Sequence, residues 1–161
     1  MRVLLILLCA VLIVVAGAGW VAWMTHRQWD RLDTAADNFE APAGFTEVAL
    51  VRQGTAFCFV SCTNGGEAIV TSVFKTNAKT PEEACRALRP VVTDLAANEV
   101  QPWSAGTECG WIGGLGGSAT IGGFAGPQST YGKDGGARWT EKIDAPDSPV
   151  VAYVEFNSGV E

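Results

Sequence analysis

The stretch VLLILLCAVLIVVAGAGWVAW, residues 3–23, contains no charged side chain and follows only Met1 and Arg2. As an α-helix it would reach about 31 Å, close to the thickness of the hydrocarbon core of a bilayer. The stretch therefore predicts a single N-terminal transmembrane helix, with the lipid bilayer as the partner of residues 3–23. Trp20 and Trp23 lie near its far end, where interfacial aromatic side chains are expected.

A cleaved signal peptide is the alternative interpretation of the same stretch. A signal peptide also begins with a positive residue and an apolar core, and Ala16-Gly17-Ala18 is an acceptable cleavage site. The apolar residues continue past this site to Trp23, which favours a retained anchor over a secreted protein. Cys9, inside the stretch, is interpreted as a small apolar residue facing lipid.

The orientation of the anchor is not decided by its flanking charges, because Arg2 precedes it and Arg27 and Arg31 follow it. A two-residue N-terminal tail has no folded mass to translocate, and the long polar remainder suits an oxidising compartment. We therefore expect a single-pass protein of the cell membrane, of the bacterial envelope type, with a cytoplasmic N-terminus and an extracytoplasmic C-terminal domain.

The rest of the 161-residue chain has room for one domain of roughly 115 residues. Without Arg2, ten of the eleven Lys and Arg remain against seventeen Asp and Glu, which gives a formal charge of −7. An acidic surface repels phosphate backbones, so nucleic acid is not an expected partner. The composition leaves the oligomeric state open.

Four cysteines lie beyond the apolar stretch: Cys58, Cys62, Cys85 and Cys109. An even number in a small translocated domain predicts two disulfides, for which three connectivities exist. In a straight strand Cys58 and Cys62 would lie about 13 Å apart, beyond disulfide reach without a bend. We therefore lean toward the crossed pairings, in which Cys58 and Cys62 are tied to Cys85 and Cys109.

Zinc is the alternative ligand for these four thiols. Zinc knuckles have two closely spaced cysteine pairs, whereas this chain has one C-x3-C pair followed by two long separations. A catalytic dithiol would need C-x-x-C near a helix start, which the sequence lacks. We expect neither a metal ion nor a cofactor.

Residues 24–43 are expected to form a helical stalk that continues the membrane helix and rests on the domain. Its apolar residues recur at intervals of three and four and form a narrow stripe. The stripe consists of Trp29, Leu32, Ala36 and Phe39, and Pro42 and Gly44 end the helix. A short dimerising seam is the alternative interpretation.

Alternating and β-branched residues predict a three-strand meander over residues 45–51, 55–62 and 68–75, with a tight turn at Asn64-Gly65. A further strand is expected over residues 149–156. Between them, Thr80-Pro81-Glu82-Glu83 is a helix-start signal in which Glu83 returns the capping bond. The expected buried face of this helix is Cys85, Leu88, Val92 and Leu95, and Pro90 should kink or split it.

The glycine-rich, uncharged residues 109–131 are interpreted as a long loop with a short strand near residues 119–124. A second membrane span is an alternative, because Gly113 and Gly117 have the spacing of packed membrane helices. Gly114-x-Gly116-x-x-Ala119 resembles a dinucleotide fingerprint, but no strand-to-helix transition surrounds it.

Groupings that could carry catalysis are few. His26 follows the anchor, where a hydrated interfacial side chain is expected, and no serine has a nucleophile-elbow context. The close carboxylate pairs are explained by helix capping and turns, and the remaining tryptophans by a hydrophobic core. These residues are Glu82, Glu83, Asp144, Asp147, Trp103, Trp111 and Trp139. The sequence names no catalytic, cofactor-binding or metal-binding residue.

Together these patterns predict an α+β fold with three parts. Residues 1–23 form a transmembrane anchor, residues 24–43 a stalk, and residues 44–161 an extracytoplasmic domain. The domain is expected to be a small antiparallel sheet packed against one helix, stabilised by disulfides and carrying a long glycine-rich loop. The expected function is non-catalytic binding of a protein or an envelope component, and the alternative is a small envelope-modifying hydrolase or a secreted protein. A deep pocket with convergent ionisable groups would favour the hydrolase.

Overall fold

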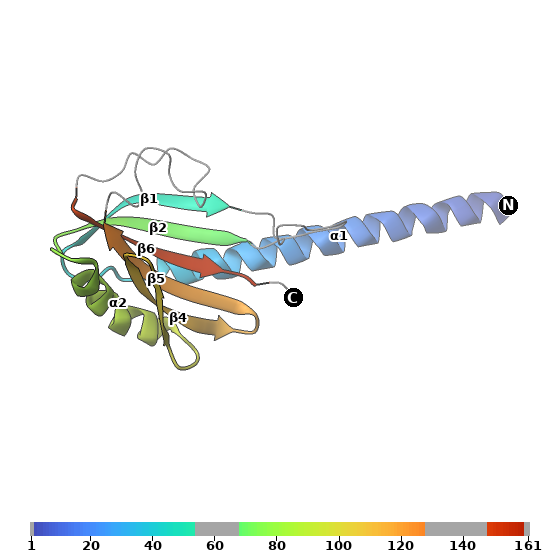
Figure 1. Ribbon diagram of the computed structural model, residues 1–161. Helices are drawn as coiled ribbons and strands as arrows, with labels where there is room; N and C mark the ends of the chain where they lie inside the picture. Colours follow the sequence, from blue (N-terminus) through green and yellow to red (C-terminus); the bar gives the residue numbers. More distant parts are fainter. Residues whose placement is uncertain (1, 54–67, 128–147, 160–161) are drawn as a thin grey trace.

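The computed structural model describes residues 2–53, 68–127 and 148–159 (Figure 1). Within these ranges the chain forms two helices and six strands, which confirms the α+β class. The elements are α1 (Arg2–Asp37), β1 (Phe45–Gln53), β2 (Ile69–Thr76), α2 (Pro81–Leu95), β3 (Gln101–Ala105), β4 (Glu108–Gly116), β5 (Ala119–Pro127) and β6 (Val150–Asn157).

The strands form one antiparallel sheet in the order β1-β2-β6-β5-β4-β3. The chain therefore places its last strand at the centre, between β2 and β5. α2 and the C-terminal part of α1 pack on the same side of this sheet, because Leu88 and Leu32 belong to one buried cluster with Phe74 and Phe156. The predicted packing of an antiparallel sheet against a helix is confirmed.

α1 is one unbroken helix, and its two halves have different surroundings. Leu32 is 1% exposed, and Trp29, Ala36 and Phe39 also pack against the sheet cluster. The ring of Phe39 lies 5.6 Å from that of Phe74 and 6.3 Å from that of Phe156. The stripe predicted for the stalk is thus the surface by which the C-terminal part of α1 and the residues just after it contact the sheet.

The N-terminal half of α1 extends away from the sheet (Figure 1). No helix in the described ranges meets the combined length and apolarity of a membrane span. The transmembrane part of the fold prediction is therefore not supported.

The start of α2 confirms the predicted cap. The Thr80 hydroxyl accepts a hydrogen bond from the Glu83 N–H at 3.3 Å, and Pro81 occupies the first helical turn. The Glu83 carboxylate accepts from the Lys79 N–H at 2.9 Å, one residue before the expected partner. Pro90 does not split the helix, which continues to Leu95.

The predicted meander is wrong in its order. The strands expected over residues 45–51 and 68–75 are present as β1 and β2, but they pair directly with each other. The strand expected over residues 55–62 and the turn at Asn64-Gly65 lie outside the described residues. A middle strand between β1 and β2 is excluded because Leu50 and Ser72 are register partners.

The glycine-rich stretch forms two sheet strands, so the prediction of a long loop is wrong. β4 and β5 pair along most of their length, and their turn contains Gly116 and Gly117 with φ angles of 93° and 62°. The same hairpin excludes a membrane helix at Gly113/Gly117 and a strand-to-helix nucleotide loop at Gly114-x-Gly116.

Close packing explains why strands so rich in glycine are stable here. A Cβ at Gly123 would lie 2.7 Å from Val92 Cγ2, and a Cβ at Gly113 would lie 2.7 Å from Ala96 Cβ. These glycines let α2 and the residue after it approach the sheet backbone. On the opposite side of the sheet, a Cβ at Gly110 would lie 2.5 Å from the ring of Phe124.

Within the described ranges, a disulfide between Cys85 and Cys109 joins α2 to β4 across 24 residues of sequence. This pairing confirms a disulfide and shows that the crossed connectivity is wrong, since Cys85 and Cys109 bond each other. The reason is that α2 lies directly on β4. Cys58 and Cys62 lie outside the described residues.

Candidate functional site

The most distinctive surface of the described residues is the N-terminal half of α1. Its large apolar side chains are between 49% and 73% exposed and point in all directions around the helix. They are Leu7, Leu8, Val11, Leu12, Ile13, Val14, Val15, Trp20 and Trp23. We call these residues the apolar sleeve. A helix that is apolar on every side is normally surrounded by protein or by lipid.

The two predicted interfacial tryptophans mark the end of the sleeve. The rings of Trp20 and Trp23 lie 5.4 Å apart, and the guanidinium of Arg27 lies 5.3 Å from the Trp23 ring centroid. One turn further, His26 and Asp30 lie 3.4 Å apart on the exposed surface. The surface of the helix therefore changes from apolar to charged within about two turns.

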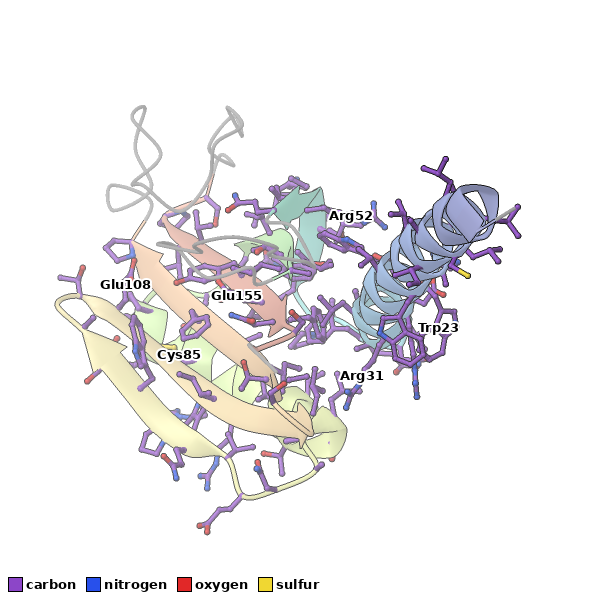
Figure 2. The ribbon with its side chains drawn as sticks, turned by 90° about the vertical axis from the view of Figure 1, so that its right-hand side faces the viewer. Trp23, Arg31, Arg52, Cys85, Glu108 and Glu155 are labelled. Atoms are coloured by element: carbon purple, nitrogen blue, oxygen red, sulfur yellow. A yellow bond between two sulfur atoms is a disulfide. The ribbon has the colours of Figure 1, made fainter. Side chains whose placement is uncertain are left out.

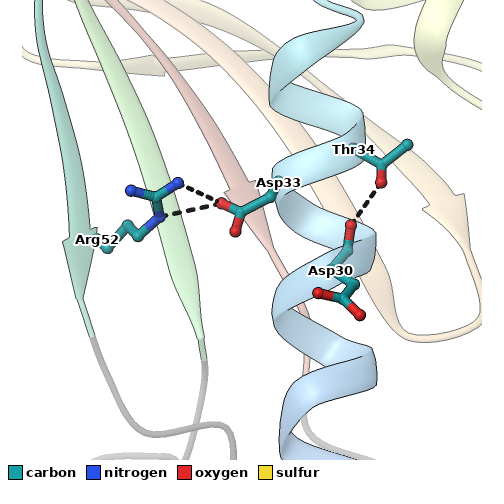
Figure 3. Close-up of polar contacts among 4 residues, drawn as sticks. All are labelled: Asp30, Asp33, Thr34 and Arg52. Atoms are coloured by element: carbon teal, nitrogen blue, oxygen red, sulfur yellow. Dashed lines mark hydrogen bonds and ion pairs between the residues drawn. The ribbon is translucent and has the colours of Figure 1, made fainter.

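Two polar clamps attach the next turns of α1 to the sheet. The Arg31 guanidinium donates to the carbonyl oxygens of Gly116 at 2.6 Å and Leu115 at 3.3 Å, in the β4–β5 turn. On the other flank of the helix, Asp33 Oδ1 accepts from Arg52 Nε at 3.0 Å and Nη2 at 2.9 Å (Figure 3). Together with buried Leu32 between them, the clamps attach α1 to the sheet on both flanks of the helix.

Nothing in the sequence patterns pointed to these clamps. In the sequence, Arg31 stands out only as a charge that follows the apolar stretch, and no pattern assigns a role to Asp33 or Arg52. Their partners come from segments distant in the chain: residue 31 meets residue 116, and residue 33 meets residue 52. Such pairs depend on where α1 crosses the sheet, which local periodicity does not determine.

The aromatic candidates have structural roles. Trp111 donates its indole N–H to the Cys85 carbonyl at 2.8 Å, and Arg89 of α2 lies 4.7 Å from its ring centroid. The Trp103 ring contacts Phe124 edge-on at 4.9 Å, and Phe124 stacks on Tyr153 at 4.9 Å. These contacts agree with the core interpretation. Trp139 lies outside the described residues.

The ionisable candidates are dispersed over the fold. His26 lies on the exposed part of α1, and Glu83 is engaged in the α2 cap beside Glu82. Across the ranges 2–53, 68–127 and 148–159, no three His, Cys, Asp or Glu side chains gather where they could hold a metal ion. Asp144 and Asp147 lie outside these ranges. Cys9 is a free, exposed thiol within the sleeve.

Figure 2, which looks along α1 from its N-terminal end, shows Trp23 and Arg31 on this helix at one flank of the sheet. Comparison with known proteins found no match to the chain among protein-family models, curated proteins or solved structures.

Proposed function

We propose that the protein is a membrane-tethered binding domain, whose residues 3–23 enter a lipid bilayer and whose sheet is presented at the bilayer surface. The observation that carries the proposal is the apolar sleeve, exposed on all sides of a helix that continues into the folded domain. A coiled-coil partner would cover only one stripe of such a helix, whereas lipid covers its whole circumference.

The order of side chains along α1 supports lipid as the occupant. The uncharged sequence from Val3 to Trp23 ends at the Trp20–Trp23 pair, and Arg27 follows. Tryptophan rings favour the headgroup level, and a cation placed beyond them contacts water and phosphate. This gradient agrees with a helix that leaves the bilayer near residue 24.

An extracytoplasmic location of the domain belongs to the same proposal. The Cys85–Cys109 disulfide supports it, because structural disulfides persist in oxidising compartments and are rare in the cytosol. The N-terminus would then remain in the cytoplasm. A binding role is favoured over catalysis because the prominent charges serve structure: Glu83 caps α2, and Asp33 holds Arg52.

Flotation of the full-length protein with phospholipid vesicles tests the tether. Substitution of Leu12→Arg together with Val15→Arg should abolish flotation, since each arginine near the centre of a membrane helix costs about 3 kcal/mol of insertion free energy. The matched control is Leu12→Ala with Val15→Ala, which keeps the segment uncharged and should still float. Failure of the unsubstituted protein to float, with assembly into a large soluble oligomer instead, would contradict the proposal.

A further inference from the structure

We infer that α1 is a rigid mount that turns one particular edge of the sheet toward the lipid headgroups. This edge consists of the β4–β5 turn, residues 115–118, and the chain after β6, residues 157–159; we call it the bilayer-facing edge. The inference rests on the proposed function, because it requires the apolar sleeve to lie in lipid.

The first step is the distance along α1. Arg31, whose guanidinium bonds the carbonyl oxygens of Leu115 and Gly116, lies eight residues after Trp23. At the rise of an α-helix this places the clamp about 12 Å beyond the interfacial tryptophan. The β4–β5 turn therefore lies close to the headgroup layer and not at the end of a long tether.

The second step is the rigidity of the mount. α1 continues without a break from the sleeve to Asp37, and its sequence has no proline between Trp23 and Arg31. Arg31 holds one flank of the helix and Asp33 the other, through Arg52. The sheet therefore moves with the membrane segment as one body, and its orientation to the bilayer is set by α1.

The third step is the direction of the edge. In Figure 1 the β4–β5 turn and the end of β6 lie on the side from which the N-terminal half of α1 extends, and the start of α2 lies on the opposite side. β4 runs between the two sides, from Glu108 to Gly116. Its length separates the bilayer-facing edge from the β3–β4 turn by roughly 30 Å.

The composition of the edge fits a lipid surface. Its residues are Leu115, Gly116, Gly117, Ser118, Asn157, Ser158 and Gly159, none of which is charged. The Ser118 hydroxyl donates to the Ser158 carbonyl at 3.1 Å, and the Asn157 side-chain oxygen accepts from the Gly159 N–H at 2.8 Å. The chain after the apolar stretch has a formal charge of −7 and is repelled by anionic headgroups, and a neutral edge reduces that repulsion within a Debye length of the surface.

Fluorescence quenching in vesicles tests the orientation. In a Cys9→Ser background, a bimane label is attached at Ser118→Cys on the bilayer-facing edge or at Ala105→Cys on the opposite side. With nitroxide on the lipid headgroups, the label at 118 should be quenched at least about threefold more than the label at 105, because contact quenching is lost over the length of β4. Ala97→Cys is a second near label, since the Ala97 N–H donates to the Gly114 carbonyl at 2.7 Å.

Two insertions between Arg27 and Gln28 separate a rigid mount from mere proximity. A flexible Gly-Ser insert of about six residues should make quenching at 118 and 105 equal, because the helix no longer transmits orientation. An alanine-rich helical insert of about seven residues keeps the rotational phase and raises the domain by roughly 10 Å. The helical insert should weaken the quenching of the label at 118, and the label at 105 should still be quenched less than the label at 118.

The same samples distinguish the two proposals. Labelled protein that floats with vesicles but shows equal quenching at 118, 97 and 105 would overturn the fixed orientation and leave the tether intact. Protein that does not float would overturn the tether and the orientation with it.

Discussion

At the scale of single residues, side-chain size at the sheet surface sets how closely the helices approach. Gly123 and Gly113 lie under α2 and the residue that follows it, where a Cβ would meet Val92 or Ala96 at 2.7 Å. At α1 a polar side chain makes the contact with the sheet. Arg31 donates hydrogen bonds to two carbonyl oxygens of the β4–β5 turn, whose glycines have positive φ angles. The sequence does not reveal the role of these glycines, because a glycine-rich stretch has the composition of a loop. It does not reveal the role of Arg31 either, because the partner of Arg31 lies on a distant segment.

Substitution of Gly123→Ala tests this account of α2 packing. The new methyl group would require Val92 to shift, which should lower the free energy of unfolding by about 1–3 kcal/mol. The measurement is urea unfolding in mild detergent, followed by tryptophan fluorescence. Val92→Ala in the same chain should relieve the clash, so that the double variant is more stable than the sum of the single effects predicts.

Gly19→Ala is the matched control for this cycle, because nothing lies within 4 Å of the Cβ position at Gly19. It should leave the unfolding of the domain unchanged. Strictly additive effects of Gly123→Ala and Val92→Ala would show that the close approach of α2 does not explain this glycine.

At the scale of elements, the sequence predicted what local chemistry controls. The α2 cap at Thr80 and the buried face through Leu88 and Val92 follow from spacing alone, and both are present. β1 and β2 followed from alternation. The β4–β5 hairpin did not, because its strands replace side-chain volume with glycine and take their packing from Val92 and Phe124.

The pairing of the cysteines also could not be predicted from local sequence patterns. The crossed disulfides were preferred because Cys58 and Cys62 were assigned to a straight strand, but Cys85 bonds Cys109 where α2 crosses β4. The sleeve and its tryptophans were predictable, since they depend on composition along one helix. The clamps from Arg31 and Asp33 were not, since their partners lie on strands distant in sequence.

Removal of the observed disulfide tests its role at this scale. Cys85→Ala with Cys109→Ala should lower the free energy of unfolding by about 3 kcal/mol, because the bridge closes a loop of 24 residues in the unfolded chain. Cys9→Ala is the control and should have no effect on the domain. Peptide mapping without reduction should find Cys85 linked to Cys109, and any remaining disulfide between Cys58 and Cys62. A peptide linking Cys85 or Cys109 to either of the other two would contradict this connectivity.

At the scale of the whole molecule, the two halves of the continuous helix α1 have different roles. Its N-terminal half carries the apolar sleeve, and its C-terminal half forms part of the hydrophobic core through Leu32, with Trp29 and Ala36 packed beside it. The absence of a break between the halves means that whatever surrounds the sleeve also positions the sheet. The account therefore depends on the surroundings of the sleeve.

Cys9 provides a native probe of those surroundings, because it is free, exposed and within the sleeve. The most direct test is electron paramagnetic resonance of a nitroxide attached to Cys9 in full-length protein reconstituted into vesicles, with Cys9→Ser protein reporting any label elsewhere. The account predicts that relaxation is enhanced by oxygen, which concentrates in lipid, and little by a water-soluble nickel chelate. A label relaxed by the nickel chelate as strongly as one on the exposed surface of α2 would contradict it.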